Sequence, residues 1–359
     1  VDQDFKMPSV WRSSLGIDYK IPNTPLTFTS DFLYTKDVNA VFQFGANRKV
    51  ATEKMLEGDR DYYANAAAYT YNNAIGANSA TVLTNTDVKG YSVSATAGFN
   101  LSNWHGFSGS AFYTFSEAKE VTANAGSSAS SAWSGSLTTN SPNEQIRTLS
   151  NFSVPHRVVA NLSYNFKNTS IGVYYSGASQ GRFSYYYGND VNGDGISNDL
   201  MLIPGDVSTM KFANIVSGGN VLFTADQQRD AFAQFIKDNG LEKYAGRVLP
   251  RNGFLLPWLN RFDLRISQAL FKDMVQGGDK IALSLDIINF GNMLNSDWGI
   301  QDYTVSSYGA AVLSRSGSVS KDPTYTMLRE GTGLATKPYR AASTTSTTWS
   351  AMLGIKYSF

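Results

Sequence analysis

The chain has 359 residues, a length that suits one large β domain or two ordinary domains. It carries 30 Lys and Arg residues against 29 Asp and Glu residues, so its charge balance gives no sign of a nucleic-acid partner. Cysteine is absent, which excludes a disulfide scaffold, a thiolate metal site and a cysteine nucleophile. No run in the sequence approaches the roughly 18 apolar residues of a membrane-spanning helix.

The first part of the chain contains segments in which apolar and polar side chains alternate, as they do along a β-strand with two different faces. In segment 11–20 the apolar side chains Leu15, Ile17 and Tyr19 share one face, and every charge lies on the other. The run from Pro22 to Pro25 predicts a tight turn. A second strand is predicted at 26–35, and a long polar loop at about 45–87.

The same pattern continues through the middle of the chain. Strands are predicted at 91–99, 107–116, 158–166, 171–175, 262–267 and 281–287. Short turns are predicted at 100–105, 167–168 and 276–279, with His105 in a turn and His156 at the head of the fifth strand. Long loops are predicted at about 117–154, from the sixth strand to Pro257, and at about 291–345.

The last eleven residues form the clearest strand. One face carries Trp349, Ala351, Leu353, Ile355, Tyr357 and Phe359, and the other carries Ser350, Met352, Gly354, Lys356 and Ser358. A strand of this length with lipid on one side and water on the other is typical of a transmembrane β-barrel. The edge strand of a soluble β-sandwich is the alternative for this segment taken alone.

The connections favour the barrel. About nine strands are joined alternately by short turns and by loops of tens of residues, as in outer-membrane barrels, whose short turns lie on the periplasmic side. On this reading the first strand runs from outside to periplasm, so the strand before it is expected to be missing. An open sheet edge is costly in lipid. We therefore expect residues 1–359 to be the C-terminal part of a larger antiparallel barrel.

Three segments of the second half carry a family resemblance: Leu256–Gln268, Leu285–Asn295 followed by Trp298 and Gly299, and Leu353–Phe359. They resemble the C-terminal barrel of TonB-dependent outer-membrane transporters, and most of all the Oar-like group of Bacteroidetes. The loop Asp190–Leu200 and the pair Arg251 and Asn252 belong to the same resemblance.

The resemblance implies a 22-stranded barrel closed by a plug, in the outer membrane of a Gram-negative bacterium. It implies that the chain belongs to a receptor that captures a ligand at the cell surface and imports it with energy from the TonB system. The partners implied are outer-membrane lipid and the plug and N-terminal strands, supplied by the same precursor or by another chain. The alternative function is a structural or adhesive surface protein anchored by the barrel. No catalytic signature stands out, so no enzyme is predicted.

The acidic loop at 190–199 predicts a structural calcium site. Asp190, Asn192, Asp194 and Asn198 stand at positions 1, 3, 5 and 9 of a calcium loop, and Ile196 offers its carbonyl at position 7. Met201 replaces the usual glutamate at position 12, so Asp199 is predicted to complete a weak site. The alternative is an Asn-, Asp- and Gly-rich turn without metal. We favour the metal because three carboxylates within ten residues would repel one another without a cation.

Three further features yield predictions. Segment 224–240 predicts one loop helix, with Thr224 as N-cap and a buried stripe of Phe232, Phe235 and Ile236. It is either a lid over the barrel mouth or a helix that only packs its loop.

The aromatic run Phe183–Tyr187 suits ligand stacking, an interfacial girdle or a loop core. A hairpin turn at Val275–Gln276 predicts Arg265 opposite Asp286 on the lumen face.

Overall fold

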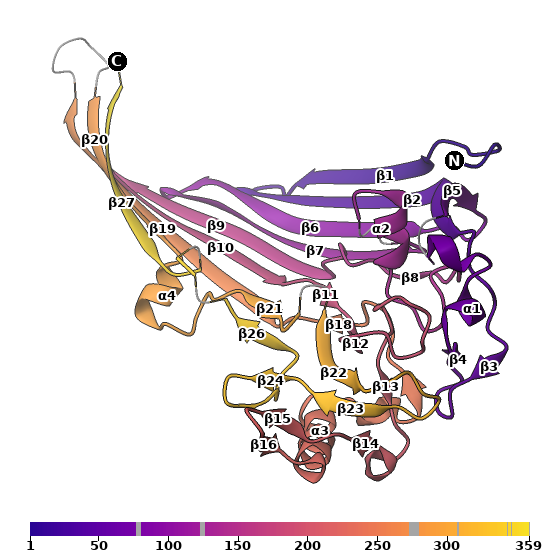
Figure 1. Ribbon diagram of the computed structural model, residues 1–359. Helices are drawn as coiled ribbons and strands as arrows, with labels where there is room; N and C mark the ends of the chain where they lie inside the picture. Colours follow the sequence, from indigo (N-terminus) through magenta and orange to yellow (C-terminus); the bar gives the residue numbers. More distant parts are fainter. Residues whose placement is uncertain are drawn as a thin grey trace.

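The computed structural model describes residues 1–76, 80–122, 126–272, 280–306, 309–342, 344–345 and 347–358. One large antiparallel sheet dominates it (Figure 1). Its nine long strands follow one another in chain order: β1 (Ser9–Lys20), β2 (Leu26–Gly45), β6 (Tyr91–Trp104), β7 (Phe107–Glu120), β9 (His156–Phe166), β10 (Thr169–Ser179), β19 (Trp258–Lys272), β20 (Lys280–Ile288) and β27 (Ser350–Ser358). The predicted all-β class is confirmed, and each predicted strand is present.

Several strands are longer than predicted, among them β10 and β19, which were predicted at 171–175 and 262–267. β2 continues ten residues past Thr35, because β5 (Thr81–Thr86), which lies in the predicted first loop, pairs with its far half. β6 continues through the predicted turn at 100–105, because Asn100 and Leu101 still pair with β7. Phe359 and the predicted turn at Val275–Gln276 lie outside the described residues.

The three described short connections share one backbone device. Asn23, His105 and Lys167 all adopt positive φ angles, of 58°, 50° and 52°. At His105 and Lys167 these angles belong to two-residue hairpin turns, whose twist matches that of the flanking strands, whereas Asn23 lies in a five-residue connection between β1 and β2. Gly106 follows His105 with φ 89°, and a Cβ added there would lie 2.6 Å from the carbonyl oxygen of Asn165. The hairpin of β6 and β7 therefore needs glycine at this position.

The two faces of the sheet differ as the alternation predicts. One face exposes large apolar side chains on edge and central strands alike, including Leu15, Phe99, Leu162, Val173, Leu353 and Ile355. The exposed fraction reaches 74% at Leu353 and 76% at Ile355. No second layer covers this face within the described ranges, whereas a soluble sandwich buries such side chains.

The other face carries polar side chains that bond across neighbouring strands. Thr96 and Thr114 share a hydrogen bond of 2.9 Å, and Asn161 donates to Ser110 at 2.6 Å. Arg265 pairs with Asp286 in the register, and its Nε lies 3.4 Å from the carboxylate. The predicted partnership of Arg265 and Asp286 is confirmed.

The long connections gather at one end of the sheet and fold into one body, which we call the loop body (Figure 1). Its small sheet has the order β12 (Tyr185–Tyr187), β22 (Ala310–Ser316), β23 (Thr324–Met327) and β14 (Lys211–Phe212). Fully buried side chains from the third and fourth long connections form its core, including Tyr185, Met201, Phe232, Leu249, Val312 and Leu313, and Met55 of the first connection packs against them.

The remaining elements are short. The strands are β3 (Glu53–Lys54), β4 (Asp61–Tyr62), β8 (Thr148–Leu149), β11 (Arg182–Phe183), β13 (Leu202–Ile203), β15 (Ile215–Ser217), β16 (Asn220–Phe223), β17 (Arg247–Val248), β18 (Phe254–Leu255), β21 (Asp302–Thr304), β24 (Arg329–Glu330), β25 (Gly333–Leu334) and β26 (Tyr339–Ala341). The helical turns are α1 (Ala66–Tyr69), η1 (Asn73–Ile75), α2 (Ala129–Ser134), η2 (Val207–Thr209), η3 (Glu242–Tyr244) and α4 (Phe290–Leu294). Among the residues described, no helix is long and apolar enough to cross a membrane.

The predicted loop helix is α3 (Ala225–Asp238). Thr224 and Gln227 form a capping box at its N-terminus, and the predicted buried stripe of Phe232, Phe235 and Ile236 is confirmed. The buried amide of Gln228 donates to the carbonyl of Ala213 at 2.7 Å and accepts from the backbone of Met327 at 3.0 Å. These bonds tie α3 to the small sheet, as expected for a helix that packs its loop.

Candidate functional site

The acidic loop is compact, and hydrogen bonds between the Asp190 side chain and the backbone of the loop hold it in shape. The carboxylate of Asp190 accepts hydrogen bonds from the backbone of Gly193 at 2.7 Å and of Gly195 at 2.9 Å. Gly193 and Gly195 both have positive φ, and a Cβ on Gly193 would lie 2.0 Å from the carbonyl oxygen of Tyr63. The glycines thus let the loop close against the first long connection.

Two arginines from the first long connection reach into this loop. Arg48 forms an ion pair with Asp194 and donates to its carbonyl oxygen at 2.6 Å. Arg60 lies 2.7 Å from the carboxylate of Asp199 and also donates to the carbonyl of Leu200. All four charged side chains are buried. The cations that balance the two buried carboxylates are therefore guanidinium groups of this chain.

Burial dominates the titration of both carboxyl groups. It raises the pKa of Asp194 to about 8, with Arg48 acting in the opposite direction. Burial also raises the pKa of Asp199, and there Arg60 acts in the opposite direction. A buried carboxylate is stable in its charged form only beside a cation. Each arginine thus lowers a carboxyl pKa that burial alone would raise further.

These pairs bear directly on the predicted calcium site. A calcium ion takes six to eight oxygen ligands, and both Asp194 and Asp199 already bind a guanidinium. No group of three acidic or histidine side chains that could hold a metal occurs in the described part of the chain. Asn198 Oδ1 is buried without a hydrogen-bond partner, and Arg315 donates to the backbone carbonyl of Asp190 at 2.8 Å rather than to its carboxylate. The present arrangement does not fit a calcium ion unless an arginine withdraws, so calcium binding stays a prediction.

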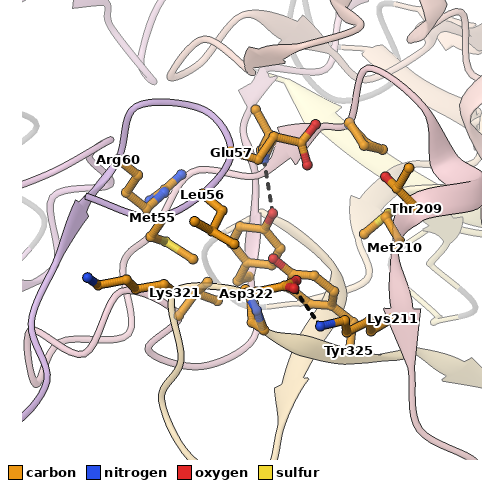
Figure 2. A pocket seen from close by; sticks show the side chains of 15 residues that line it. Met55, Leu56, Glu57, Arg60, Thr209, Met210, Lys211, Lys321, Asp322 and Tyr325 are labelled. Carbon is orange, nitrogen blue, oxygen red and sulfur yellow. Dashed lines mark hydrogen bonds and ion pairs between the residues drawn. The ribbon is translucent and has the colours of Figure 1, made fainter. Parts of the chain in front are cut away.

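A pocket of about 330 Å³ opens beside the acidic loop (Figure 2). Figure 2 shows Met55 and Arg60 on one side of it and Thr209 and Met210 on another. Val191 of the acidic loop also lines it. The pocket is therefore built from the first, third and fourth long connections, and Arg60, the partner of Asp199, forms part of its wall.

The pocket combines an aromatic wall with a charged rim. The rings of Tyr187 and Tyr325 stack with centroids 5.4 Å apart. On the rim, Lys211 pairs with Asp322, and Lys321 lies 2.7 Å from the carboxylate of Glu53. An aromatic surface with paired charges beside it suits a ligand that carries both apolar and charged groups.

The structure brings the predicted acidic residues together but gives other roles to the aromatic run. Phe183 and Tyr185–Tyr187 are buried in the loop body, so the loop-core alternative is the one observed. Of the run, only Tyr187 lines this pocket. Arg48 and Arg60 were missed by the sequence analysis, which took 45–87 as a polar loop. The surplus of carboxylates at 190–199 was the one signal that pointed to them.

No protein-family model matches the chain, and no curated protein matches it in sequence. Among solved structures, the chain is similar to the outer membrane transporter YddB from Escherichia coli, with a TM-score of 0.45 and 12% sequence identity. The similarity covers 99% of this chain and 33% of that transporter. The chain thus spans about a third of the length of the transporter.

Replacing Arg48 with alanine should destabilise the loop body strongly, because it leaves the buried Asp194 without its cation. We expect a loss of about 3 to 5 kcal/mol in the free energy of unfolding. The loss should be larger at about pH 8 than at about pH 5. Burial raises the pKa of Asp194, so without Arg48 its carboxyl keeps its proton in the folded state but ionises in the unfolded state, which favours unfolding as the pH rises. Denaturant titration with a loop-body probe measures both values.

A matched control is Lys54→Ala, which removes an exposed cation whose Nζ lies 2.9 Å from Asp61 in the same connection. Such a pair contributes only about 0 to 1 kcal/mol. Adding Asp194→Asn to Arg48→Ala should recover part of the loss. Equal effects of Arg48→Ala and Lys54→Ala would contradict the assigned role.

Proposed function

We propose that the chain is part of an outer-membrane β-barrel receptor that captures a ligand at the surface of a Gram-negative cell and passes it through a plugged lumen. The resemblance of its second half to TonB-dependent transporters, and to their Oar-like group, supports this proposal. The observation that carries it is the spacing of aromatic side chains on the apolar face of the sheet.

Aromatic side chains lie eight positions apart on β1, β6 and β7 and from the residue before β27 to its Tyr357, at the loop end and at the turn end of the same face. The pairs are Trp11 and Tyr19, Tyr91 and Phe99, Phe107 and Phe115, and Trp349 and Tyr357. Eight residues span about 26 Å along a strand. Strand tilt reduces this to roughly 20 Å, close to the ~25 Å apolar band of a membrane barrel with its aromatic girdles. We call these two groups the loop-side row and the turn-side row.

The polar face and the loop body supply the other parts of the proposal. A face lined by threonine, asparagine and the Arg265 pair suits a watery lumen filled by a plug. The loop body, with its pocket beside Tyr187, then lies on the extracellular side of the membrane. The plug, the remaining strands and the TonB-binding segment are the partners that such a receptor requires.

The alternative is a structural or adhesive surface protein that uses the barrel as an anchor. One observation favours it: residues of the first, third and fourth long connections form a packed body with a core of its own, which suits a rigid display surface. Transport and adhesion differ in their need for energy. If the chain belongs to a transporter, deleting the TonB protein should stop growth that depends on large peptides or glycans, while growth on small nutrients continues. Attachment of cells that persists without TonB, with no such growth defect, would favour the anchor.

Val173→Arg should prevent assembly into the membrane, because it places a charge in the apolar band. The cost at the midplane is about 2 to 4 kcal/mol. The matched control is Gly172→Arg on the next residue, which points to the polar face and has open space around it. The amount of protein in outer-membrane fractions of cells that express the complete gene measures the difference. Equal amounts of the two variants would contradict the proposed placement.

We also propose that calcium can enter the acidic loop, in competition with Arg48. Calorimetric titration should then detect weak binding, with a dissociation constant of about 10⁻⁴ to 10⁻³ M, that Asp190→Ala abolishes. Arg48→Ala should tighten the binding, since it frees an oxygen of Asp194. Absence of heat at millimolar calcium in both the unaltered protein and Arg48→Ala would refute this proposal.

A further inference from the structure

A second cavity lies where the sheet meets the loop body. Its volume is about 490 Å³, and its lining includes Lys119, Leu137, Thr138, Glu144, Arg147 and Leu149. We call it the rim pocket. Lys119 is near the loop end of β7 and stands opposite Tyr91 of β6 in the register. Lys119 therefore belongs to the same face of the sheet as the aromatic rows.

The loop-side row fixes the level of the rim pocket. Trp11, Tyr34 and Tyr91 form a chain of ring contacts, with centroids 6.1 Å and 6.5 Å apart. Two cations lie over the last ring: Lys119 Nζ is 5.8 Å and Arg147 Cζ is 5.5 Å from its centroid. In a membrane barrel the aromatic girdle marks the edge of the apolar band. Charged groups directly beyond it lie at the level of the lipid headgroups.

The cations of the rim pocket are incompletely paired. Arg147 is exposed and donates to the carbonyl oxygen of Lys89 at 3.3 Å, and no carboxylate pairs with it in the described ranges. Lys119 Nζ lies 3.5 Å from the carboxylate of Glu117, which also accepts from the Tyr91 hydroxyl. A guanidinium with free donors and a nearby ammonium suit a phosphate group.

The same cavity contains polar oxygens without partners. Thr138 is only 8% exposed, and its Oγ1 has no hydrogen-bond partner. Glu144 Oε2 is also buried and unpartnered, although Oε1 accepts from Asn140 at 2.8 Å. Buried polar atoms are nearly always bonded in folded proteins, so these two oxygens call for hydroxyl groups or water. Leu137 and Leu149 add an apolar wall.

We propose that the rim pocket binds the phosphorylated sugar headgroup of a glycolipid of the outer leaflet. Lys119 and Arg147 contact the phosphate, Thr138 and Glu144 bond the sugar hydroxyls, and the leucine wall packs against the sugar ring. The position of Lys119 and Arg147 beside the aromatic girdle, and the level of the pocket, both favour a membrane lipid as the occupant. This inference rests on the proposed outer-membrane placement and goes beyond ligand capture, because the rim pocket is separate from the pocket beside Tyr187.

The test measures lipid retained by the complete protein purified in detergent, with bisphosphorylated lipid A as the probe and native mass spectrometry as the readout. The double variant Lys119→Ala/Arg147→Ala should reduce the affinity at least roughly tenfold, since it removes two charged contacts. Thr138→Val should also weaken binding, and it leaves no partner behind because Oγ1 has none in the fold. The matched control Lys237→Ala/Lys243→Ala removes two exposed cations on and beside α3 and should change nothing.

Dephosphorylated lipid A should bind more weakly than the bisphosphorylated form, and inorganic phosphate should not compete at millimolar concentration. Unchanged affinity in the double variant, an equal loss in the control, or equal competition by inorganic phosphate would overturn the proposal. Outer-membrane fractionation of the same variants keeps the two ideas apart. Normal fractionation with unchanged lipid A binding rejects the rim pocket alone, whereas an unaltered protein absent from the membrane fraction rejects both.

Discussion

The structure depends on the continuous backbone ladder that joins its nine long strands. Each of the seven inner strands pairs on both sides, so the amide and carbonyl groups along it are satisfied within the sheet. Only such a ladder permits large apolar side chains to stay uncovered on one face, because a lipid environment offers backbone groups no other partner. Under the proposed membrane placement, strands that cross a single apolar layer would also account for the polar opposite face and for the gathering of the long connections at one end.

Much of this ladder could be predicted from the sequence, because its signal is local. Alternation with period two places Leu15, Phe99 and Leu353 on one face, whatever residues lie far away in the chain. The helix α3 can likewise be predicted from its N-terminus, where Thr224 and Gln227 have the spacing of a capping box. The boundaries that failed involve partners that the alternation does not reveal. The far half of β2 is a strand because β5 lies beside it, and β5 sits in a segment without a sustained period.

The candidate site was much less predictable, since its chemistry joins residues far apart in the chain. The acidic loop was recognisable from its Asp and Asn spacing, but the groups that balance its charge were not. Arg48 and Asp194 are separated by 146 positions, and Arg60 and Asp199 by 139. A sequence motif rich in Asp and Asn predicts that a cation will lie in the loop. It does not show whether that cation is a metal ion or an arginine from another loop.

The distance between these partners also has a consequence for folding. The core of the loop body draws on side chains from Met55 to Met327, and its two buried ion pairs close loops of well over a hundred residues. Contacts of such long sequence separation form slowly, because the chain loses much conformational entropy before these contacts contribute any favourable free energy. The hairpins of the sheet can form one after another, because each long strand pairs with the long strand next to it in the chain. The loop body, by contrast, can consolidate only after the strands that carry its loops are side by side, so its compactness reports that the sheet has been assembled in the correct order.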